Sequence, residues 1–229
     1  MTLAATRLQH HPSRAGLTRE TKAGPVWTGE VRFNEQWLDQ PIRWKRPREV
    51  FVVAHGDLFH ENVPDEWIDR VFSTMRAAPW HRYQVLTKRT DRACRYLGTE
   101  PPMPGVWIGT SVERQMEADE RGPYLATIAG DFGWNTWVSY EPALGMVEWT
   151  GWEFIRWMVS GGESGPKARP TDPAWHRVAR DFCIARGIPF FFKQTGSNSL
   201  NWSFPITGKG DNIDQWPDEF YVRETPSVR

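Results

Sequence analysis

Residues 155–164 read IRWMVSGGES, in which a short, mostly apolar run passes into two glycines and an acidic side chain. Apolar residues on consecutive positions over such a short length are typical of a strand that is buried on both faces, here residues 155–159. The same arrangement, an apolar run followed by polar residues, occurs five more times along the chain. The other runs are residues 50–53, 83–86, 106–109, 136–138 and 189–192.

Helical patterns separate most of these runs. Pro64 suits the first turn of a helix, and the residues after it place apolar side chains three and four positions apart. Asp172 as N-cap, Pro173 at the first helical position and Gly187 at the end delimit another helix. A further helix is expected to break near residues 122–123, which are Gly-Pro. The expected helices are residues 64–77, 91–97, 113–129 and 172–186.

Strands that alternate with helices predict an α/β fold, because right-handed crossovers bring the C-terminal ends of all strands to one face. With 229 residues, the chain is shorter than the roughly 250 residues of a complete eight-unit barrel. We therefore expect one domain overall, built on a partial (β/α) barrel of about six units. Residues 1–48 are expected to form an irregular segment and connector, residues 49–200 the barrel, and residues 201–229 a C-terminal tail that is loose from Arg223 onwards.

The composition excludes several classes of function. The 28 basic and 28 acidic side chains give a net charge of zero, which argues against nucleic-acid binding driven by overall charge. The cluster of basic residues at 43–48 is either a solvated loop or a local patch for phosphates. No apolar run approaches the roughly 18 residues of a membrane span, and residues 1–24 contain no signal-peptide pattern, so we expect a cytoplasmic protein that does not contact membranes. Cys94 and Cys183 are expected to be buried free thiols.

Polar residues that follow the runs are expected to form a rim around one face of the barrel. Gly161 and Gly162 either let a ligand approach the main chain closely or simply form a tight turn. The carboxylate of Glu163, just beyond them, could accept hydrogen bonds from an amine or a ribose hydroxyl. Glu113 and Glu141 occupy equivalent places after two earlier strands. The three carboxylates could hold a cation, orient a cationic ligand or act as acid and base, or each could instead form an ion pair with a basic residue of the rim.

Basic and amide side chains complete the rim. They could meet a carboxylate or phosphate of a ligand, or pair with the rim glutamates. These residues are Lys88, Arg89, Lys193 and Gln194.

Residues 55–61, HGDLFHE, resemble a metal site in composition. Their spacing matches no zinc motif, and no cysteine accompanies them, so we expect no metal there. Asp57 is expected to form hydrogen bonds within the rim, and His60 to be structural. A metal-dependent hydrolase that uses His55, Asp57 and the rim glutamates remains a third hypothesis.

Several short motifs together resemble a phage and prophage family of unknown function that is similar to radical SAM enzymes and is sometimes called the three-Cys-motif family. The resemblance implies a radical-SAM-like partial barrel and, in complete members, a [4Fe–4S] cluster that cleaves S-adenosylmethionine. It extends from about residue 16 to residue 196. The segments that carry it are residues 16–22, 41–48, 57–61, 85–89, 111–113, 141–142, 161–165 and 191–194.

The resemblance also implies roles for the rim residues, although it assigns no catalytic residue. The residues expected to contact the cofactor are Glu141, Gly161, Gly162 and Glu163. The residues expected to contact the substrate are Asp57, Lys88, Arg89, Glu113, Lys193 and Gln194.

The chain departs from this family at the cluster ligands. Complete members carry three close cysteines after a first strand, just before the segment that matches residues 4–17, and only residues 1–3 precede it here. Iron–sulfur clusters need thiolates, so we expect S-adenosylmethionine and [4Fe–4S] as cofactors only if a missing N-terminus is restored. We expect the reading frame upstream of Met1 to encode that strand and the cysteines; a decayed prophage remnant and a shortened binding protein are the alternatives. The missing first strand would leave a sheet edge for self-association.

Two functions thus follow from the sequence besides the hydrolase. One is a radical-SAM-like enzyme that is complete only with upstream sequence. The other is a barrel without a cluster that binds a nucleotide-like small molecule or docks on a partner; nucleic acid as that partner is left open.

Overall fold

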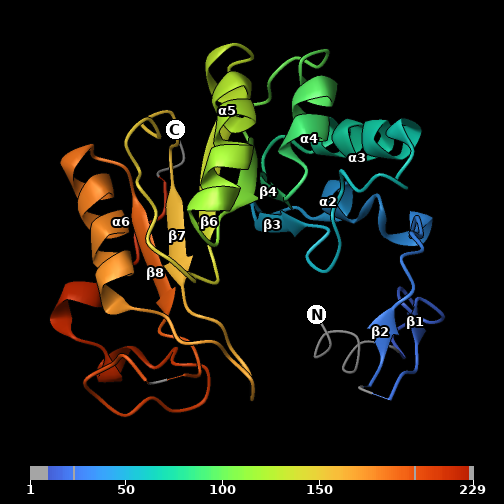
Figure 1. Cartoon of the computed structure of the whole chain (residues 1–229). Helices are drawn as coiled ribbons and strands as arrows, with labels where there is room; N and C mark the ends of the chain where they lie inside the picture. The colour runs from blue at the N-terminus through green and yellow to red at the C-terminus, as the bar shows by residue number, and fades with distance from the viewer. Residues whose placement is uncertain (1–9, 23, 199, 227–229) are drawn as a thin grey trace. The chain divides into compact units, whose positions relative to one another are not determined.

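The computed structural model describes residues 10–22, 24–198 and 200–226, whose helices and strands are labelled in Figure 1. The chain divides into two compact units. Unit 1 comprises Met1–Tyr83 and unit 2 comprises Gln84–Arg229. None of the helices in the described ranges has the length and apolar character needed to cross a bilayer.

Unit 1 combines short elements with one long helix. Strands β1 (Thr18–Arg19) and β2 (Val26–Trp27) pair antiparallel, with Thr18 opposite Trp27. The helical turn η1 (Glu35–Trp37) and helix α2 (Gln40–Arg43) lead to strand β3 (Glu49–Val52) and helix α3 (Asp65–Ala77). The helix predicted at residues 64–77 is confirmed.

Helix α3 forms where its sequence favours one. Asp65 and Glu66 lie in its first turn and Arg76 in its last, so their charges complement the helix dipole. Ile68, Phe72 and Met75 are buried on one face, as expected for apolar residues at this spacing.

Unit 2 carries most of the strands and helices of the barrel. The boundary between the units falls inside strand β4 (Arg82–Thr87), which is followed by α4 (Thr90–Leu97), β5 (Val106–Ser111), α5 (Gln115–Gly130) and β6 (Asn135–Tyr140). Strand β7 (Met158–Gly161), helix α6 (Pro173–Ala185) and strand β8 (Phe190–Gln194) complete it. The strand order is β3-β4-β5-β6-β7-β8, and β5 to β8 pair in parallel. The α/β fold with a partial (β/α) barrel is confirmed.

Two local predictions are wrong. The fifth strand begins at Met158 and includes Ser160 and Gly161, because Ile155 still belongs to a turn in which its N–H donates to Trp152 O. Helix α5 also continues without a break through Gly122 and Pro123. A Cβ at Gly122 would stand 2.9 Å from the Trp152 indole, so Trp152 packs closely on this glycine. This packing supports the helix where Gly122 and Pro123 disfavour it.

Both faces of the sheet in unit 2 are apolar, since successive side chains of a strand point to opposite sides. One face buries Ile108, Val138 and Met158 completely. The other carries a cluster of tryptophans, namely Trp107, Trp137 and Trp157, with Val159 beside them. The expectation of strands buried on both faces is therefore met.

Within this cluster, Trp137 lies over the backbone of the neighbouring strand. Its partner across the β5–β6 ladder is Gly109, and its indole N–H donates to Trp107 O at 3.3 Å. A Cβ at Gly109 would stand 2.7 Å from Cδ2 of the indole and closer still to Cε2 and Nε1. Only glycine therefore leaves room for Trp137 in this position.

Helix α6 has the predicted ends. The carboxylate of Asp172 accepts a hydrogen bond from Ala174 N at 2.8 Å, and Pro173 begins the helix. Gly187 takes a positive φ of 63° just after it, a conformation that glycine adopts at little cost.

A buried histidine joins α6 to strand β7. Both ring nitrogens of His176 are engaged, Nδ1 with Ser160 Oγ at 2.7 Å and Nε2 with Thr171 Oγ1 at 2.9 Å. All three residues are buried, and the imidazole packs against aromatic rings that include those of Phe192 and Trp202. Burial lowers the pKa of His176 to about 3, so the imidazole is neutral.

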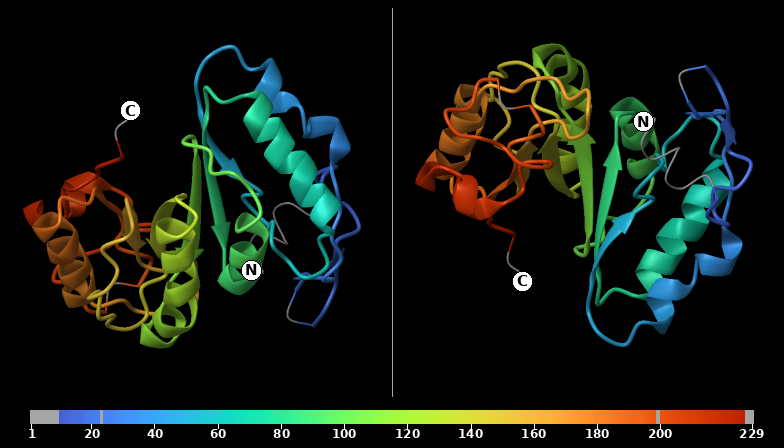
Figure 2. Two further views of the ribbon diagram at one scale, coloured as in Figure 1. Left: turned by 90° about the horizontal axis from the view of Figure 1, so that it is seen from above. Right: turned by 90° about the horizontal axis from the view of Figure 1, so that it is seen from below.

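Residues 200–226, mostly red in both views of Figure 2, lie beside the orange helix α6 and pair with strand β8 through backbone hydrogen bonds. Phe192 N donates to Val222 O at 2.8 Å, and Glu224 N donates to Phe190 O at 2.9 Å. Arg223 forms an antiparallel bridge with Phe191. The prediction of a loose chain from Arg223 is therefore wrong for Arg223 and Glu224, because they satisfy the edge of β8.

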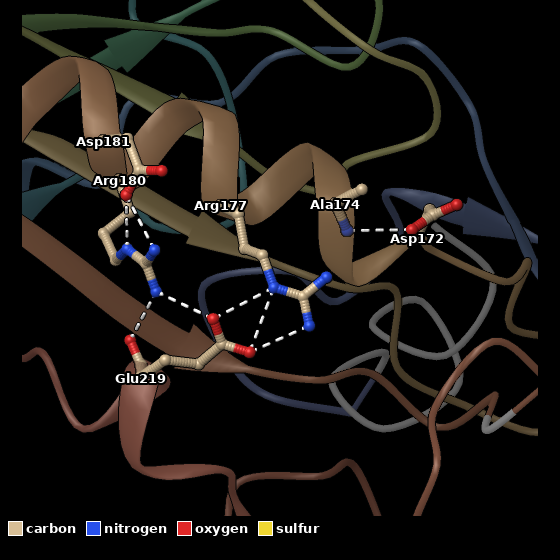
Figure 3. Close-up of polar contacts among 6 residues, drawn as sticks. All are labelled: Asp172, Ala174, Arg177, Arg180, Asp181 and Glu219. Carbon is tan, nitrogen blue, oxygen red and sulfur yellow. Dashed lines mark hydrogen bonds and ion pairs between the residues drawn. The ribbon is translucent and has the colours of Figure 1, made fainter.

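An arginine–glutamate cluster holds this segment to α6 (Figure 3). Arg177 donates to both carboxylate oxygens of Glu219 at 2.8 to 3.0 Å. Arg180 donates to the Glu219 carbonyl at 3.0 Å and to its carboxylate at 3.1 Å. Hydrogen bonds from Arg177 and Arg180 lower the pKa of Glu219.

Replacing this carboxylate should loosen the segment. For Glu219→Gln we expect a loss of about 1 kcal/mol of local stability, the upper range for solvent-screened ion pairs. Hydrogen exchange of the Phe192 and Glu224 amides, which pair β8 with residues 222–224, should then become about fivefold faster. Glu153→Gln, which removes an exposed pair with Arg186, is the control and should leave both amides unchanged. Equal exchange rates in the two variants would contradict this role for Glu219.

Candidate functional site

The rim of unit 2 is formed by the residues at and just beyond the C-terminal ends of β4 to β8. Parallel strands bring these ends to the same edge of the sheet. The predicted site residues that lie there are Lys88, Arg89, Glu113, Glu141, Gly161, Gly162, Glu163, Lys193 and Gln194. Asp57 belongs to unit 1, where its carboxylate accepts a hydrogen bond from Phe59 N at 2.9 Å and so closes a turn.

Glu113 is a buried carboxylate with two basic partners. It is 7% exposed, forms an ion pair with Lys88 and accepts a hydrogen bond from Arg121 at 3.0 Å. Arg121 also donates to Ser111 O at 2.7 Å, which fixes its guanidinium against the end of β5. Arg121 was not expected from the sequence; its position two turns beyond Glu113, in helix α5, is the only signal for it.

Glu141 has a corresponding arrangement at the end of β6. Lys193, from the end of β8, places Nζ 3.1 Å from Oε1 of Glu141. Ser139 Oγ donates to Oε2 at 3.2 Å, since residues two apart on a strand share a face. The structure thus joins Glu141 to Lys193, as the ion-pair alternative predicted.

The two pairs share an order of burial. The side chains of Glu113 and Glu141 are 10% and 16% exposed, whereas those of Lys88 and Lys193 are 54% and 51% exposed. The carboxylates are therefore more buried than the lysines that they hold, whose side chains are about half exposed. In each pair the basic side chain is thus the one more accessible to an approaching ligand.

The glycines at the end of β7 allow close packing of main chain. A Cβ at Gly161 would stand 2.9 Å from Oε1 of Glu141, and one at Gly162 would overlap the carbonyl of Thr195. Gln194 Nε2 donates to Gly162 O at 2.8 Å, which uses the Gln194 amide inside the protein. The glycines thus bring the ends of β6, β7 and β8 together, and their contact with a ligand stays a prediction.

The loop after Glu141 connects three strand ends. The Glu141–Pro142 peptide bond is cis. Ala143 N donates to Gly161 O at 3.0 Å, and Leu144 N donates to Glu113 O at 2.9 Å. This loop therefore fixes the backbone of both Glu113 and Gly161.

Glu163 pairs with a residue that the sequence did not reveal. Arg169 donates to it from Nε at 2.8 Å and from Nη2 at 2.9 Å, and the backbone N–H of Arg169 also donates at 2.8 Å. The hydrogen bond from the guanidinium is the main cause that lowers the pKa of Glu163. The fork geometry of an arginine and a carboxylate six residues apart closes the loop 163–169.

Arg89 lies at the start of α4, and its N–H donates to Thr87 Oγ1 at 2.9 Å. This bond orients the backbone between β4 and α4. Contact of the Arg89 side chain with a substrate stays a prediction.

The residues present do not fit the cluster that the sequence resemblance implies. Cys94 lies in α4 and Cys183 in α6, and they are the only two cysteines of the chain. The Cys183 thiol is buried 3.8 Å from the sulfur of Met158, and burial raises its pKa to about 12. Burial also raises the pKa of Cys94. Two cysteines on separate helices do not supply the set of close thiolates that a [4Fe–4S] cluster needs.

The metal-dependent hydrolase also lacks support. Among residues 10–22, 24–198 and 200–226, no three histidine, cysteine, aspartate or glutamate side chains are grouped closely enough to hold a metal ion. The pKa of His55 is lowered, mainly because burial disfavours the charged imidazole. The positive charge of Arg14 lowers this pKa further.

The fold and the rim together define an α/β protein of the partial (β/α) barrel class whose strand ends carry paired charges. The chain belongs to DUF5131, a family of proteins of unknown function, whose model matches residues 1–216. No curated protein and no solved structure matches the chain.

Proposed function

We propose that unit 2 binds a small, nucleotide-like ligand at the rim. The observation that supports this is the order of burial, in which Glu113 and Glu141 are buried or nearly so and each holds a more exposed lysine, Lys88 or Lys193. Ammonium groups that are already oriented lose less freedom when they meet an anionic ligand.

The chemistry of the rim defines the ligand class. Lys88 and Lys193 would bind a phosphate or carboxylate group. Glu141 and Glu163 could accept hydrogen bonds from an amine or a ribose hydroxyl, sharing their oxygens with Lys193 and Arg169. A ligand with both an anionic group and a ribose or amine matches this pattern, as nucleotides and S-adenosylmethionine do.

The resemblance to radical SAM enzymes makes S-adenosylmethionine one probe among others. Its carboxylate would meet a lysine, and its amino group would meet Glu141 or Glu163. Since the two cysteines do not fit a cluster, we derive no radical step and assign no catalytic residue.

The proposal is tested by titration calorimetry with adenosine, AMP and S-adenosylmethionine. We expect AMP and S-adenosylmethionine to bind more tightly than adenosine, which has no anionic group. Lys193→Gln should weaken AMP binding about tenfold, in line with the contribution of a charge-assisted hydrogen bond. Glu141→Gln should have a similar effect, because Lys193 loses the carboxylate that positions it.

Lys209→Gln is the matched control. Lys209 is also exposed and paired, with Asp211 at 3.1 Å, but its carboxylate partner is itself about half exposed, so this pair lacks the buried glutamate of the rim pairs. If none of the three probes binds, or if Lys193→Gln and Lys209→Gln bind AMP equally well, the rim is not the binding site.

A further inference from the structure

A second feature, in unit 1, carries an inference that is independent of the rim. Four basic residues lie within six positions, Arg43, Lys45, Arg46 and Arg48, and all four are exposed. Arg43 pairs with Asp39 at 2.9 Å. The other three form no ion pair with any residue in the described part of the chain, so this loop carries a local surplus of positive charge.

The backbone of this loop is fixed at three points. Arg48 N donates to Nδ1 of His81 at 3.0 Å, so Nδ1 has no proton and Nε2 carries it. Nε2 then donates to Pro41 O at 2.8 Å. The indole N–H of Trp80 donates to Trp44 O at 3.0 Å. A solvated loop needs no such support, and here one buried histidine and one tryptophan hold its two ends and its middle.

Aromatic rings lie among the cations. The Arg48 guanidinium stands 4.7 Å from the Trp44 ring centroid, in cation–π geometry. Trp80 is 43% exposed, although tryptophan is usually largely buried. The same residue therefore supports the loop through its N–H and offers an apolar ring to solvent.

We propose that this surface, residues 41–48 together with Trp80, binds single-stranded nucleic acid. Lys45, Arg46 and Arg48 would contact successive phosphates, and a base would stack on Trp80. Cations interleaved with an exposed aromatic ring are the usual means of holding unpaired strands, because every base offers a face for stacking. A duplex keeps its bases stacked inside, so its binding would use the cations alone.

The net charge of zero affects how strongly the affinity for nucleic acid should depend on salt concentration. Attraction would come from this loop and not from the molecule as a whole, so few phosphates should be neutralised. The dependence of affinity on salt should accordingly be shallow, with a slope of about 0.7 per phosphate contacted on a single strand.

The test is fluorescence anisotropy of the full chain with a short labelled oligothymidylate at several salt concentrations. The double variant Lys45→Ala, Arg46→Ala should weaken binding and reduce the salt slope by about 1.4, the value for two lost phosphate contacts. Trp80→Ala should weaken binding about tenfold, as for one lost base stack, and should leave the salt slope unchanged. Trp80→Phe removes the hydrogen bond to Trp44 but keeps a ring, so it should bind more tightly than Trp80→Ala.

Controls separate this proposal from general attraction to polyanions. The double variant Arg19→Ala, Lys22→Ala removes two exposed positive charges elsewhere in unit 1 and should bind as the unaltered protein does. The proposal is overturned if the oligonucleotide does not bind, or if the two double variants weaken binding equally. It is also overturned if inorganic polyphosphate or a duplex competes as well as the single strand while Trp80→Ala has no effect.

Discussion

Gly109→Ala is expected to lower the free energy of unfolding by about 3 kcal/mol, the upper range for forcing an extra group into a packed core. The new methyl group would overlap the Trp137 indole, which lies directly over Gly109. The indole cannot swing away easily, because it is buried and packs on Trp157 with 5.2 Å between ring centroids. Chemical denaturation followed by circular dichroism would measure the loss.

Gly130→Ala provides the matched control. Gly130 is exposed at the end of α5, and a Cβ there would have no atom within 4 Å. We expect this variant to be as stable as the unaltered protein or slightly more stable, by up to about 1 kcal/mol, since alanine favours helix. If the two alanine variants differ by less than their experimental error, the packing of Trp137 on Gly109 is not as described.

Stability is expected to fall as the pH decreases from 6.5, because His176 must remain neutral in the folded protein. Its pKa is lowered from 6.5 to about 3 by burial. Between pH 6.5 and pH 3 the unfolded chain therefore binds a proton at His176 that the folded protein does not bind. The stabilisation is complete above pH 6.5 and is lost progressively toward pH 3, with a slope of up to about 1.4 kcal/mol per pH unit.

Between pH 6.5 and pH 5, the contribution of the histidines to stability can be measured separately from that of the carboxylates. Glu163 and Glu219 have pKa values below the usual 4.5, so their contributions are lost only at lower pH. His55 acts in the same direction as His176, because its pKa is also lowered. Denaturation curves at several pH values should show a flatter dependence for His176→Asn than for His55→Asn. An unchanged slope in His176→Asn would rule out this role for the imidazole.

The architecture could be predicted because each strand is marked in the sequence by an apolar run that is followed by polar residues. Each apolar run that precedes a polar group became a strand within a few residues of the expected place, and the ends of α6 were readable from Asp172 and Gly187. The break expected in α5 was wrong because local propensity at Gly122 and Pro123 is outweighed by Trp152, a residue thirty positions later. The sequence of the helix alone does not indicate this contact with Trp152.

The site was predictable only in part, for a similar reason. The acidic and basic residues of the rim were identified by their position after strands, and two of the expected ion pairs formed. Arg121 and Arg169 were missed, because their roles depend on how α5 and the loop 163–169 return to the strand ends. For Gly161 and Gly162 the sequence left open a ligand approach or a tight turn, whereas the contact that the structure shows is close packing on Glu141 and Thr195.

The pairing of β8 with residues 222–224 has a consequence for biosynthesis. Strand β8 leaves the ribosome before the residues that hydrogen-bond to its edge through Phe190 and Phe192. Until residue 224 has been translated and has emerged, this edge and the aromatic rings around Phe192 stay uncovered. Nascent chains that stall between residues 195 and 220 should therefore be preferred clients of chaperones that recognise exposed apolar strands.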